Sequence, residues 1–489
     1  MLLRDLADVR ALFSSLRGTV SGIGMTAYSR IVPAYFLQPY HIIALRKTRD
    51  LPLLRKRADI FCLEEETRDF VGEQGLNSAH LLSHPRVRKV LKNLPEPRYL
   101  LLYQSYPELE ALARSEGWML LANPSSLRMR VAERAYFRRL AEDLQLNLIP
   151  GDMYPINDVY VHNYKYWAKK IDSRLVIQLP DIRQGGGRGT FFVKSMSDYQ
   201  KLQDRLKGGT WRGIKLKTFS IYKYMEGIPA SLTLCLTRHG ILFSGLQRQL
   251  IDLPYCNDIP EDGVFCGHSW GGAPWPSDIQ DEAIRQARLI GEVLSGLGYR
   301  GILGIDFLIT KDTKQVYPVE CNPRFTGAFP MLSLLHLRDH LIPMDVFHML
   351  EFLDVSYQID PVSLNSKYMA SVKGSHIILF TLPGAALRGR KKPDAGRYEF
   401  DPDTGRISFL EWDSDYGDIQ NERQFIIIDG PPDTGEKGMG WKDPLHRLCR
   451  ILFSYPIVDE QEFLSSQAIF VANWAYETMF ELHRKAVIL

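Results

Sequence analysis

The chain has 489 residues, enough for about three domains, and 45% of them are hydrophobic, as in ordinary globular proteins. Its net charge of +3 is close to neutral, which argues against a nucleic-acid binder held by bulk electrostatics. The six cysteines are scattered, with no C-x-x-C pair and no His/Cys cluster, so we expect neither a disulfide framework nor a zinc site.

The sequence also lacks the signals of membrane insertion or secretion. No apolar run reaches the length of about 18 residues that a membrane span needs. Residues 1–18 mix acids and bases at helical spacing and lack the apolar core of a secretory signal. We therefore expect a cytoplasmic protein with no membrane and no nucleic acid among its partners.

Residues 1–122 are predicted to form a small α/β domain. A helix is expected over residues 108–116, and strands that alternate with helices favour a parallel sheet. No G-x-G-x-x-G occurs, so dinucleotide binding has no support. The domain either contributes to a ligand pocket or serves only for packing. The predicted strands are residues 40–45, 58–63, 99–103 and 119–122.

Residues 123–170 are predicted to be helical and are very basic. Arg134 and Arg138 are four residues apart and would share a helix face. Such a row of charges indicates either an anion contact or a solvated surface. The basic residues are Arg128, Arg130, Arg134, Arg138 and Arg139.

Residues 171–225 contain a glycine-rich segment between two predicted strands, 175–179 and 191–194. Glycines remove the Cβ atoms that would block a phosphate, and successive backbone N–H groups can surround an anion. The segment, DIRQGGGRGT at 181–190, is not a Walker loop, because no Gly-Lys-Ser/Thr follows and no helix begins there. It is either a phosphate-binding hairpin tip or a plain turn.

Residues 231–298 are predicted to contain a hairpin, an irregular segment and a helix. Strands 232–236 and 241–244 form the hairpin, and Arg248 follows on the next extended piece. Residues 256–272 are expected to be irregular, with a loop near substrate in which His268 is structural. An amphipathic helix is expected over 277–297.

A charged turn at 311–314 joins two predicted strands, 301–310 and 315–320, of which the first is apolar around one acid. Asp306 and Glu320 share a face only if the connection holds three or five residues, and Asn322 then follows on the face of Glu320. Apposed carboxylates repel each other unless a cation lies between them, and oxygen ligands suit Mg²⁺ or Mn²⁺. The alternative, acids that face water, is disfavoured because the first strand is so apolar.

Residues 327–489 are predicted to contain both helices and strands. A helical region is expected from 327 to about 353. Residues 366–489 are predicted to form a strand-rich domain with strands in 371–382, 398–412 and 424–428 and helices over 443–452 and 461–483.

The pattern Gly301-x-x-Gly304-x-Asp306-Phe307, followed by Glu320-x-Asn322-Pro323-Arg324-x-x-Gly327, resembles the metal-binding end of the ATP-grasp superfamily of carboxylate–amine ligases. The glycine-rich segment and the basic helix precede it in the family's order, so the resemblance covers about residues 123–330. It implies an ATP-grasp fold, of the α/β (α+β) class, with an N-terminal α/β domain (1–122). An ATP-grasp domain (123–365), with a lid at about 171–225, and a C-terminal α+β domain (366–489) would follow.

The resemblance assigns roles residue by residue. Asp306, Glu320 and Asn322 would hold Mg²⁺ (or Mn²⁺) on the phosphates of ATP. Arg324 would contact the transferring phosphate or the substrate carboxylate, and Arg248 would touch the γ-phosphate. The expected ATP-binding residues are Arg134, Gln178, Gly185, Gly186, Gly187, Arg188, Gly189, Tyr222, Lys223, Tyr224 and Met225, of which the last four line the adenine slot at a hinge.

Two departures from the family pattern bear on nucleotide binding. Gln178 stands where the family has a lysine that contacts the phosphates, so a charge is missing there unless Arg183 or Arg188 replaces it. Pro229 stands where an acid often holds the ribose. For Tyr224 and Met225, ordinary core packing is the alternative to adenine contact.

The function implied by the resemblance is ATP-dependent, ADP-forming ligation of a small-molecule carboxylic acid to an amine through an acylphosphate. Dimers are common in the family, so a homodimer is one expectation. The alternatives are an ATP-grasp carboxylase or phosphoryl-transfer enzyme with the same metal site, and a non-catalytic nucleotide-binding module, which the departures at Gln178 and Pro229 motivate.

Overall fold

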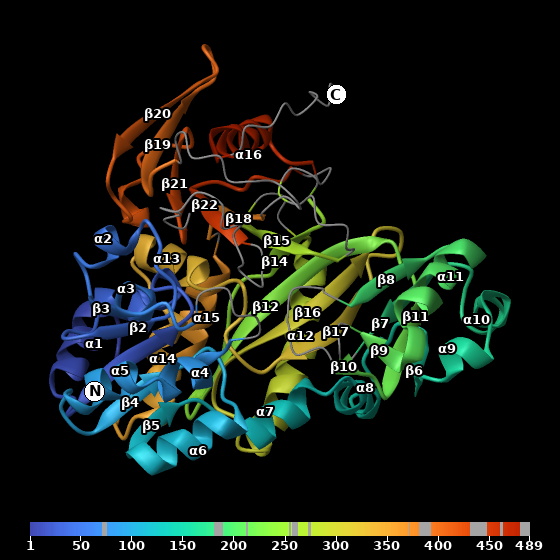
Figure 1. Cartoon of the computed structure of the whole chain (residues 1–489), viewed down its shortest axis with the longest axis horizontal. Helices are drawn as coiled ribbons and strands as arrows, with labels where there is room; N and C mark the ends of the chain where they lie inside the picture. Colours follow the sequence, from blue (N-terminus) through green and yellow to red (C-terminus); the bar gives the residue numbers. More distant parts are fainter. Residues whose placement is uncertain are drawn as a thin grey trace.

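Two large sheets form the body of the molecule, and a smaller sheet projects from one side of it (Figure 1). The computed structural model describes residues 1–70, 76–179, 189–211, 214–253, 256, 263–271, 275–370, 372–380, 393–430, 447–459 and 463–479. None of the helices in these ranges combines the length and the apolar character that crossing a membrane requires.

The N-terminal sheet has five parallel strands in the order β3-β2-β1-β4-β5. The four predicted strands are confirmed, but the central strand β1 was missed because its sequence, TVSGIG, has no apolar run. A Cβ at Gly22 would lie 2.1 Å from the Tyr40 hydroxyl, so the small residues of β1 allow close packing. The strands are β1 Thr19–Gly24, β2 His41–Ala44, β3 Asp59–Cys62, β4 Arg98–Leu101 and β5 Trp118–Leu121.

Helices cover this sheet, and the predicted helix over 108–116 is confirmed as α6. Buried leucines and valines of α4 and α5 pack with the apolar residues of the strands in one core cluster. The helices are α1 Leu6–Ser14, α2 Leu51–Leu54, α3 Leu63–Glu66, α4 Ser78–Ser83, α5 Pro85–Lys92 and α6 Pro107–Glu116.

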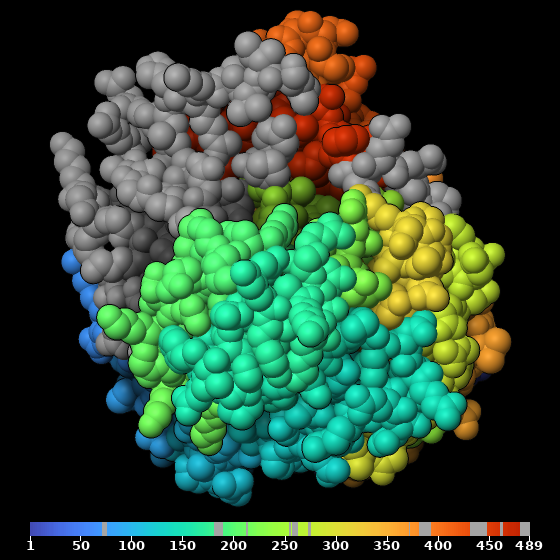
Figure 2. Space-filling model, turned by 90° about the vertical axis from the view of Figure 1, so that its right-hand side faces the viewer, coloured from blue at the N-terminus to red at the C-terminus, as the bar shows by residue number. Residues whose placement is uncertain are grey.

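The smaller sheet is antiparallel, with the order β6-β11-β7-β8, and has its own core around the fully buried Trp167. We call residues 151–223 the lid; their teal-to-green surface faces the viewer in Figure 2. Gln178 pairs with Thr190, so the predicted strands on both sides of the glycine-rich segment are confirmed. The strands are β6 Gly151–Pro155, β7 Leu175–Gln178, β8 Thr190–Val193 and β11 Thr218–Lys223, with the short pair β9 Thr210–Trp211 and β10 Ile214–Lys215 beside them.

Helices lead into the lid and cover it. The expectation that 123–170 is helical does not hold for β6, which belongs to the lid sheet and lies upstream of the predicted lid boundary. The five residues of β6 are all at least partly exposed, so the sequence lacks the apolar alternation that predicts a strand. The helices are α7 Ser125–Ala132, α8 Arg134–Asp143, α9 Asp158–Val161, α10 Tyr164–Lys170 and α11 Met196–Arg205.

The second large sheet runs through the whole remainder of the chain. Its order is β17-β16-β12-β14-β15-β18-β22-β21-β19-β20, with β13 beside β12, and every pairing is antiparallel. The C-terminal strands therefore extend the central sheet and do not form a sheet of their own. The strands are β12 Gly227–Thr237, β13 Gly240–Phe243, β14 Gln247–Ile251, β15 Phe265–Trp270, β16 Gly301–Thr310, β17 Val316–Asn322, β18 Gly374–Phe380, β19 Gly396–Asp401, β20 Arg406–Glu411, β21 Gln424–Ile428 and β22 Arg447–Phe453.

Two predictions about this sheet were wrong. The segment GHSWGG was expected in a loop, but its first four residues belong to β15 between β14 and β18. A helix was expected over 443–452, whereas the described part of it is β22, an interior strand buried on both faces. Short apolar runs that are buried all round do not reveal whether they are helix or strand.

Helices cover parts of both faces of this sheet. The helix predicted over 277–297 is confirmed as α12 Ser277–Gly296, which packs in one core cluster with apolar residues of β12 and β16. The other helices are α13 Met331–Arg338, α14 Met344–Phe352, α15 Pro361–Met369 and α16 Ser466–Met479.

Candidate active site

A β-bulge in the hairpin of β16 and β17 sets the geometry of the two carboxylates. Ile309 pairs with Val316, so the number of residues between the two paired strands is even. This does not meet the predicted condition of a connection with three or five residues. The register then shifts by one, so that Asp306 nevertheless pairs directly with Glu320. Val319 is the extra residue of the bulge, and Pro318 beside it tolerates the irregularity because β17 is the edge strand.

The two faces of β16 differ in character. Ile305, Phe307 and Ile309 are buried in the core cluster that contains α12. Because side chains alternate along a strand, Asp306 points to the opposite face, into a cavity of about 2320 Å³. A cavity of that size exceeds a typical single small-molecule site of about 300–1,000 Å³.

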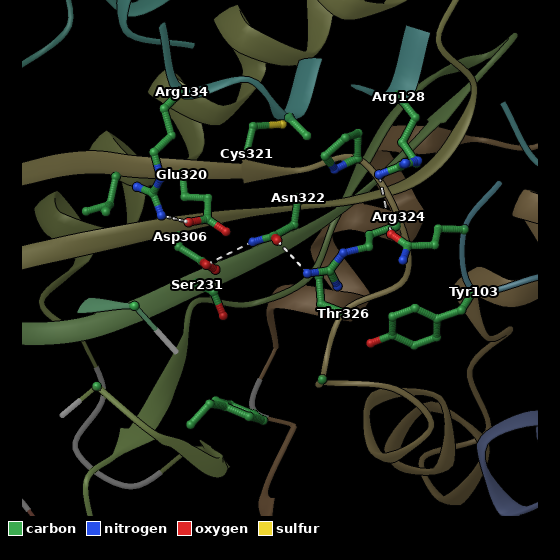
Figure 3. A pocket seen from close by; sticks show the side chains of 18 of the residues that line it. Tyr103, Arg128, Arg134, Ser231, Asp306, Glu320, Cys321, Asn322, Arg324 and Thr326 are labelled. Atoms are coloured by element: carbon green, nitrogen blue, oxygen red, sulfur yellow. Dashed lines mark hydrogen bonds and ion pairs between the residues drawn. The ribbon is translucent and has the colours of Figure 1, made fainter. Parts of the chain in front are cut away.

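Hydrogen bonds join the predicted site residues into two neighbouring groups, shown in Figure 3. Asn322 donates from Nδ2 to Asp306 at 2.9 Å, and its Oδ1 accepts from Arg324 at 2.9 Å. Arg134 forms an ion pair of 2.8 Å with Glu320. The structure therefore brings together all three predicted metal ligands and two of the predicted arginines.

Arg134 connects this site to the lid. Arg134 is the first residue of α8, which begins after Glu133 separates it from α7 with an extended backbone conformation. Its guanidinium donates to the side-chain oxygen of Gln178 at 2.7 Å. A cation at a helix N-terminus is unfavourable for the helix dipole, so helix stability does not explain it. The guanidinium therefore lies beside Gln178, where the family pattern has a lysine, whereas Arg183 and Arg188 lie outside the described residues.

The environment of Asp306 fits a cation-binding role. Burial, and after it the neighbouring Glu320, raises the pKa of Asp306 to about 7, although Arg324, Asn322 and Gln249 oppose the shift. Two facing carboxylates and an amide are hard oxygen donors of the kind that Mg²⁺ takes with few protein ligands. The donor set therefore fits the predicted metal, with Asp306, Glu320 and Asn322 as the residues that would hold it.

The hinge residues line the same cavity. Tyr222, Lys223, Tyr224 and Met225 follow one another at the end of β11 and in the connection to β12. Tyr224 contacts Phe192 edge-to-face, with ring centroids 5.7 Å apart, so it is held by the lid and not by the body's core. Of the glycine-rich segment, Gly189 lines the cavity, whereas Gly185, Gly186, Gly187 and Arg188 lie outside the described residues.

The prediction for Arg248 was wrong. Ser231 of β12 pairs with both Asp306 and Gln247, so Gln247 and Gln249 lie on the cavity face and Arg248 lies on the other. There its guanidinium stacks over Trp275 at 5.4 Å. Gln249, one residue later, donates to Asp306 at 2.8 Å and is the site residue that sequence reasoning missed. The order of strands decides this, and no local pattern indicates it.

A cationic end of the cavity was also missed. Tyr103 lies between two guanidinium groups, with Arg30 at 5.2 Å and Arg324 at 5.7 Å from its ring centroid. Arg128 lines the same cavity and lies on the side of Arg324, as Figure 3 shows. Burial, and to a lesser extent Arg324, lowers the pKa of Arg128, as expected where two like charges lie close together. Three arginines from three separate regions of the chain thus line this cavity, and only the fold brings them together.

Comparisons with known proteins bear on the domain type and the fold. Residues 182–328 match the model of an ATP-grasp domain. The chain is 24% identical over 239 residues to the formate-dependent phosphoribosylglycinamide formyltransferase of Mannheimia haemolytica, covering 46% of this chain and 54% of that one. It is 25% identical over 327 residues to the enzyme of the same name from Syntrophotalea carbinolica, covering 61% and 76%.

A solved structure shows the same fold. The biotin carboxylase domain of 2-oxoglutarate carboxylase from Hydrogenobacter thermophilus, a dimer in complex with MgADP, ADP and bicarbonate, has a TM-score of 0.54. The two sequences are 13% identical, and the alignment covers 90% of this chain and 87% of that one. Since the chain spans only about half of the first relative, that relative's activity does not transfer directly to it.

Proposed function

Since the chain carries an ATP-grasp domain, we propose that it is an ATP-dependent, ADP-forming ligase that joins a carboxylic acid to an amine through an acylphosphate. The observation that carries this proposal is one cavity that holds a pair of facing carboxylates at its centre and a cluster of arginines at one end. The first arrangement suits a metal–nucleotide complex, and the second suits the anion of an acid.

The nucleotide would lie between the lid and the large sheet. Tyr222 to Met225 offer an apolar slot for the adenine, and Gly189 and the residues before it would cover the phosphates. Arg134 and Gln178 would meet the phosphates from the body and the lid. Mg²⁺, held by Asp306, Glu320 and Asn322, would supply charge neutralisation on the transferring phosphoryl group.

The acid would bind beyond the γ-phosphate, toward Arg324. There Arg324, Arg128 and Arg30 would neutralise its carboxylate and orient one oxygen for attack on the γ-phosphorus, with ADP as the leaving group. The amine nitrogen would then attack the acyl carbon, and phosphate would leave. Closure of the lid would exclude water from the acylphosphate.

The direct test measures release of ADP and phosphate with ATP and Mg²⁺ over pools of carboxylic acids and amines. Formate belongs in the first pool, because the relatives are named formate-dependent. We expect release that needs both an acid and an amine, with a product that is lighter than their sum by one water in mass spectra.

Other outcomes separate the alternatives. Release that needs bicarbonate and an amine, with no other acid, indicates a carboxylase with the same metal site. Release with a phosphorylated product and no amine indicates phosphoryl transfer. Binding of ATP without release from any pool favours the non-catalytic nucleotide-binding module and contradicts the proposed function.

A further inference from the structure

A row of polar side chains continues across the large sheet beyond the carboxylates. Gln249 pairs with His268 of β15, and His268 pairs with His376 of β18, so all three lie on the face of the sheet that carries Asp306. Arg450 of β22 lies two residues before Leu452, the partner of His376, and therefore also on this face. His268 and Arg450 both line the cavity.

These side chains form a continuous hydrogen-bonded relay. His268 Nδ1 lies 3.1 Å from His376 Nε2, and His376 Nδ1 lies 3.0 Å from a guanidinium nitrogen of Arg450. Arg450 in turn donates from Nε to Asp429 at 2.9 Å. The two histidines and Arg450 are at most 5% exposed, so bulk water does not compete for these contacts.

The chemistry of arginine sets the direction of every bond in the relay. A guanidinium can only donate, so His376 Nδ1 must accept, and the single proton of a neutral His376 must reside on Nε2. That proton points at Nδ1 of His268, which must accept as well. The proton of His268 therefore resides on Nε2.

Both histidines remain neutral at ordinary pH. Burial, and after it the charge of Arg450, lowers the pKa of His268 to about 3 and lowers the pKa of His376 as well. Among the described residues, His268 Nε2 has no hydrogen-bond partner, although the side chain lines the cavity. An N–H group that is oriented by a relay and faces a cavity without a partner indicates a contact to a ligand.

We propose that Arg450 fixes the tautomers of His376 and His268, so that His268 presents its Nε2–H as a hydrogen-bond donor to an oxygen atom of the substrate. His268 is then a specificity-determining donor and not a general base. This rests on the proposed function only in that the ligand is one of the two substrates of the ligase.

The position of His268 restricts the substrate. Strands β12 and β14 separate β15 from β16, so the backbones of His268 and Asp306 lie three strand spacings, roughly 14 Å, apart. A molecule as small as formate cannot reach from the metal site to His268. The structure thus assigns to the larger substrate an oxygen acceptor, such as a carbonyl, carboxylate, phosphate or hydroxyl oxygen, remote from its reacting group.

The tautomers can be read without any substrate. Long-range ¹H–¹⁵N spectra of the whole chain labelled with ¹⁵N-histidine distinguish protonated from unprotonated ring nitrogens, and the His268→Gln variant assigns the signals. We expect His268 with a protonated Nε2 and an unprotonated Nδ1. A proton on Nδ1, or an imidazolium at pH 7, would overturn the proposal whatever the enzyme's activity.

Kinetics test whether the donor is used, with the acid and amine that support ADP release. His268→Gln keeps an N–H group near the position of Nε2. His268→Asn keeps a polar group near the position of Nδ1, which faces His376, but has none near the position of Nε2. We expect His268→Asn to raise the KM of the larger substrate about tenfold, as for one lost hydrogen bond, with kcat nearly unchanged. We expect the KM of His268→Gln to lie closer to that of the wild type.

Ser269→Ala is the matched control. Ser269 is the next residue of the same strand and lies on the other face of the sheet. The substitution removes a buried hydrogen bond to Ser375 but leaves the relay unchanged. Equal KM values for His268→Asn and Ser269→Ala would overturn the proposal. Absence of turnover with every pool would count against the proposed function alone, because the tautomer measurement still decides the relay.

Discussion

Arg134 is the side chain that we propose to contact the nucleotide phosphates most directly. One guanidinium nitrogen contacts Gln178 of the lid and the other contacts Glu320 of the large sheet. Gln178 stands where the family pattern has a lysine, and the guanidinium of Arg134 lies beside it, so we propose Arg134 as the cation that meets the phosphates. Its fixed charge and planar fork suit phosphate oxygens.

We expect Arg134→Met to raise the KM for ATP about tenfold or more, since a hydrogen bond to a charged group contributes about 1.5–3 kcal/mol. Steady-state ADP release at varied ATP concentration measures this. Arg139→Met is the control, because Arg139 is an exposed arginine of the same helix. Equal KM values for the two variants would show that Arg134 is only a solvated charge.

Asp306 is the carboxylate whose loss should stop the reaction. Loss of an outer-shell partner of a metal costs about 10–100-fold, so loss of a ligand in Asp306→Asn should cost turnover more than about 100-fold. The thermal unfolding temperature should stay close to that of the wild type, because the substitution removes a buried charge and keeps the volume. Near-normal ADP release by this variant would contradict the metal assignment.

At the scale of elements, the bulge in the hairpin of β16 and β17 resolves a conflict in the sequence. Val316 and Glu320 are four residues apart, so in a regular strand they would point to the same face. Val316 is buried in the core, whereas Glu320 lies on the cavity face. One extra residue, Val319, reverses the alternation between them, and bulges beside active sites commonly re-aim a side chain in this way.

The junction of β15 and β18 joins the ATP-grasp strands to the C-terminal strands, and it depends on Gly267. Gly267 has φ of +147°, and a Cβ there would lie 2.0 Å from the backbone oxygen of His376. We expect Gly267→Ala to lower the free energy of unfolding by several kcal/mol, because the two strands must separate. Chemical denaturation measures this.

Gly296→Ala provides the matched control for that measurement. Gly296 ends α12, and a Cβ there meets no atom within 4 Å. The control should stabilise the protein by about 0.5–1 kcal/mol, since alanine is the better helix former. If both variants unfold like the wild type, the junction is not closely packed in solution.

At the scale of the whole molecule, the relay connects parts that are distant in the sequence. Asp429 follows β21 and donates its backbone N–H to Asp50 of the N-terminal domain at 2.9 Å. Ion pairs between Arg57 and Asp415 and between Arg49 and Asp394 join the same two regions. The cavity is thus closed by the N-terminal sheet, the lid and the C-terminal strands together, each of which contributes lining residues.

The pKa of Asp50 indicates how the stability of this interface depends on pH. Burial raises its pKa to about 7, above its ordinary value near 3.9. The folded state therefore holds the proton more tightly than the unfolded state, so the free energy of unfolding falls as pH rises from about 4 to about 7, and then levels off.

Asp50→Asn removes this penalty, so it should stabilise the protein more at pH 8 than at pH 5. Within that window the difference grows by about 1.4 kcal/mol per pH unit at most. Urea denaturation at pH 5, 6 and 8 measures it, with Asp281→Asn on an exposed position of α12 as the control. A difference that does not grow with pH would contradict a protonated, buried Asp50.

Many local elements, and the oxygen-donor side chains of the hairpin of β16 and β17, can be predicted from the sequence alone. Strands with clear apolar runs, the long helix α12 and the pattern around Asp306, Glu320 and Asn322 are all readable, because period-2 and period-3.6 alternation are local properties. The central strand β1 and strand β6 were missed since their residues are small or half-exposed, and β22 was misread because an interior strand is apolar on both faces.

Only the tertiary structure decided which side chains meet. The order of strands places Gln249, not Arg248, beside Asp306, and it aligns His268, His376 and Arg450 on one face. It also brings Arg30 and Arg324 to the ring of Tyr103, with Arg128 in the lining of the same cavity, from three regions of the chain. These contacts join residues about 20 to 300 positions apart, and no local pattern encodes them, because strand register and packing are fixed by burial over the whole molecule.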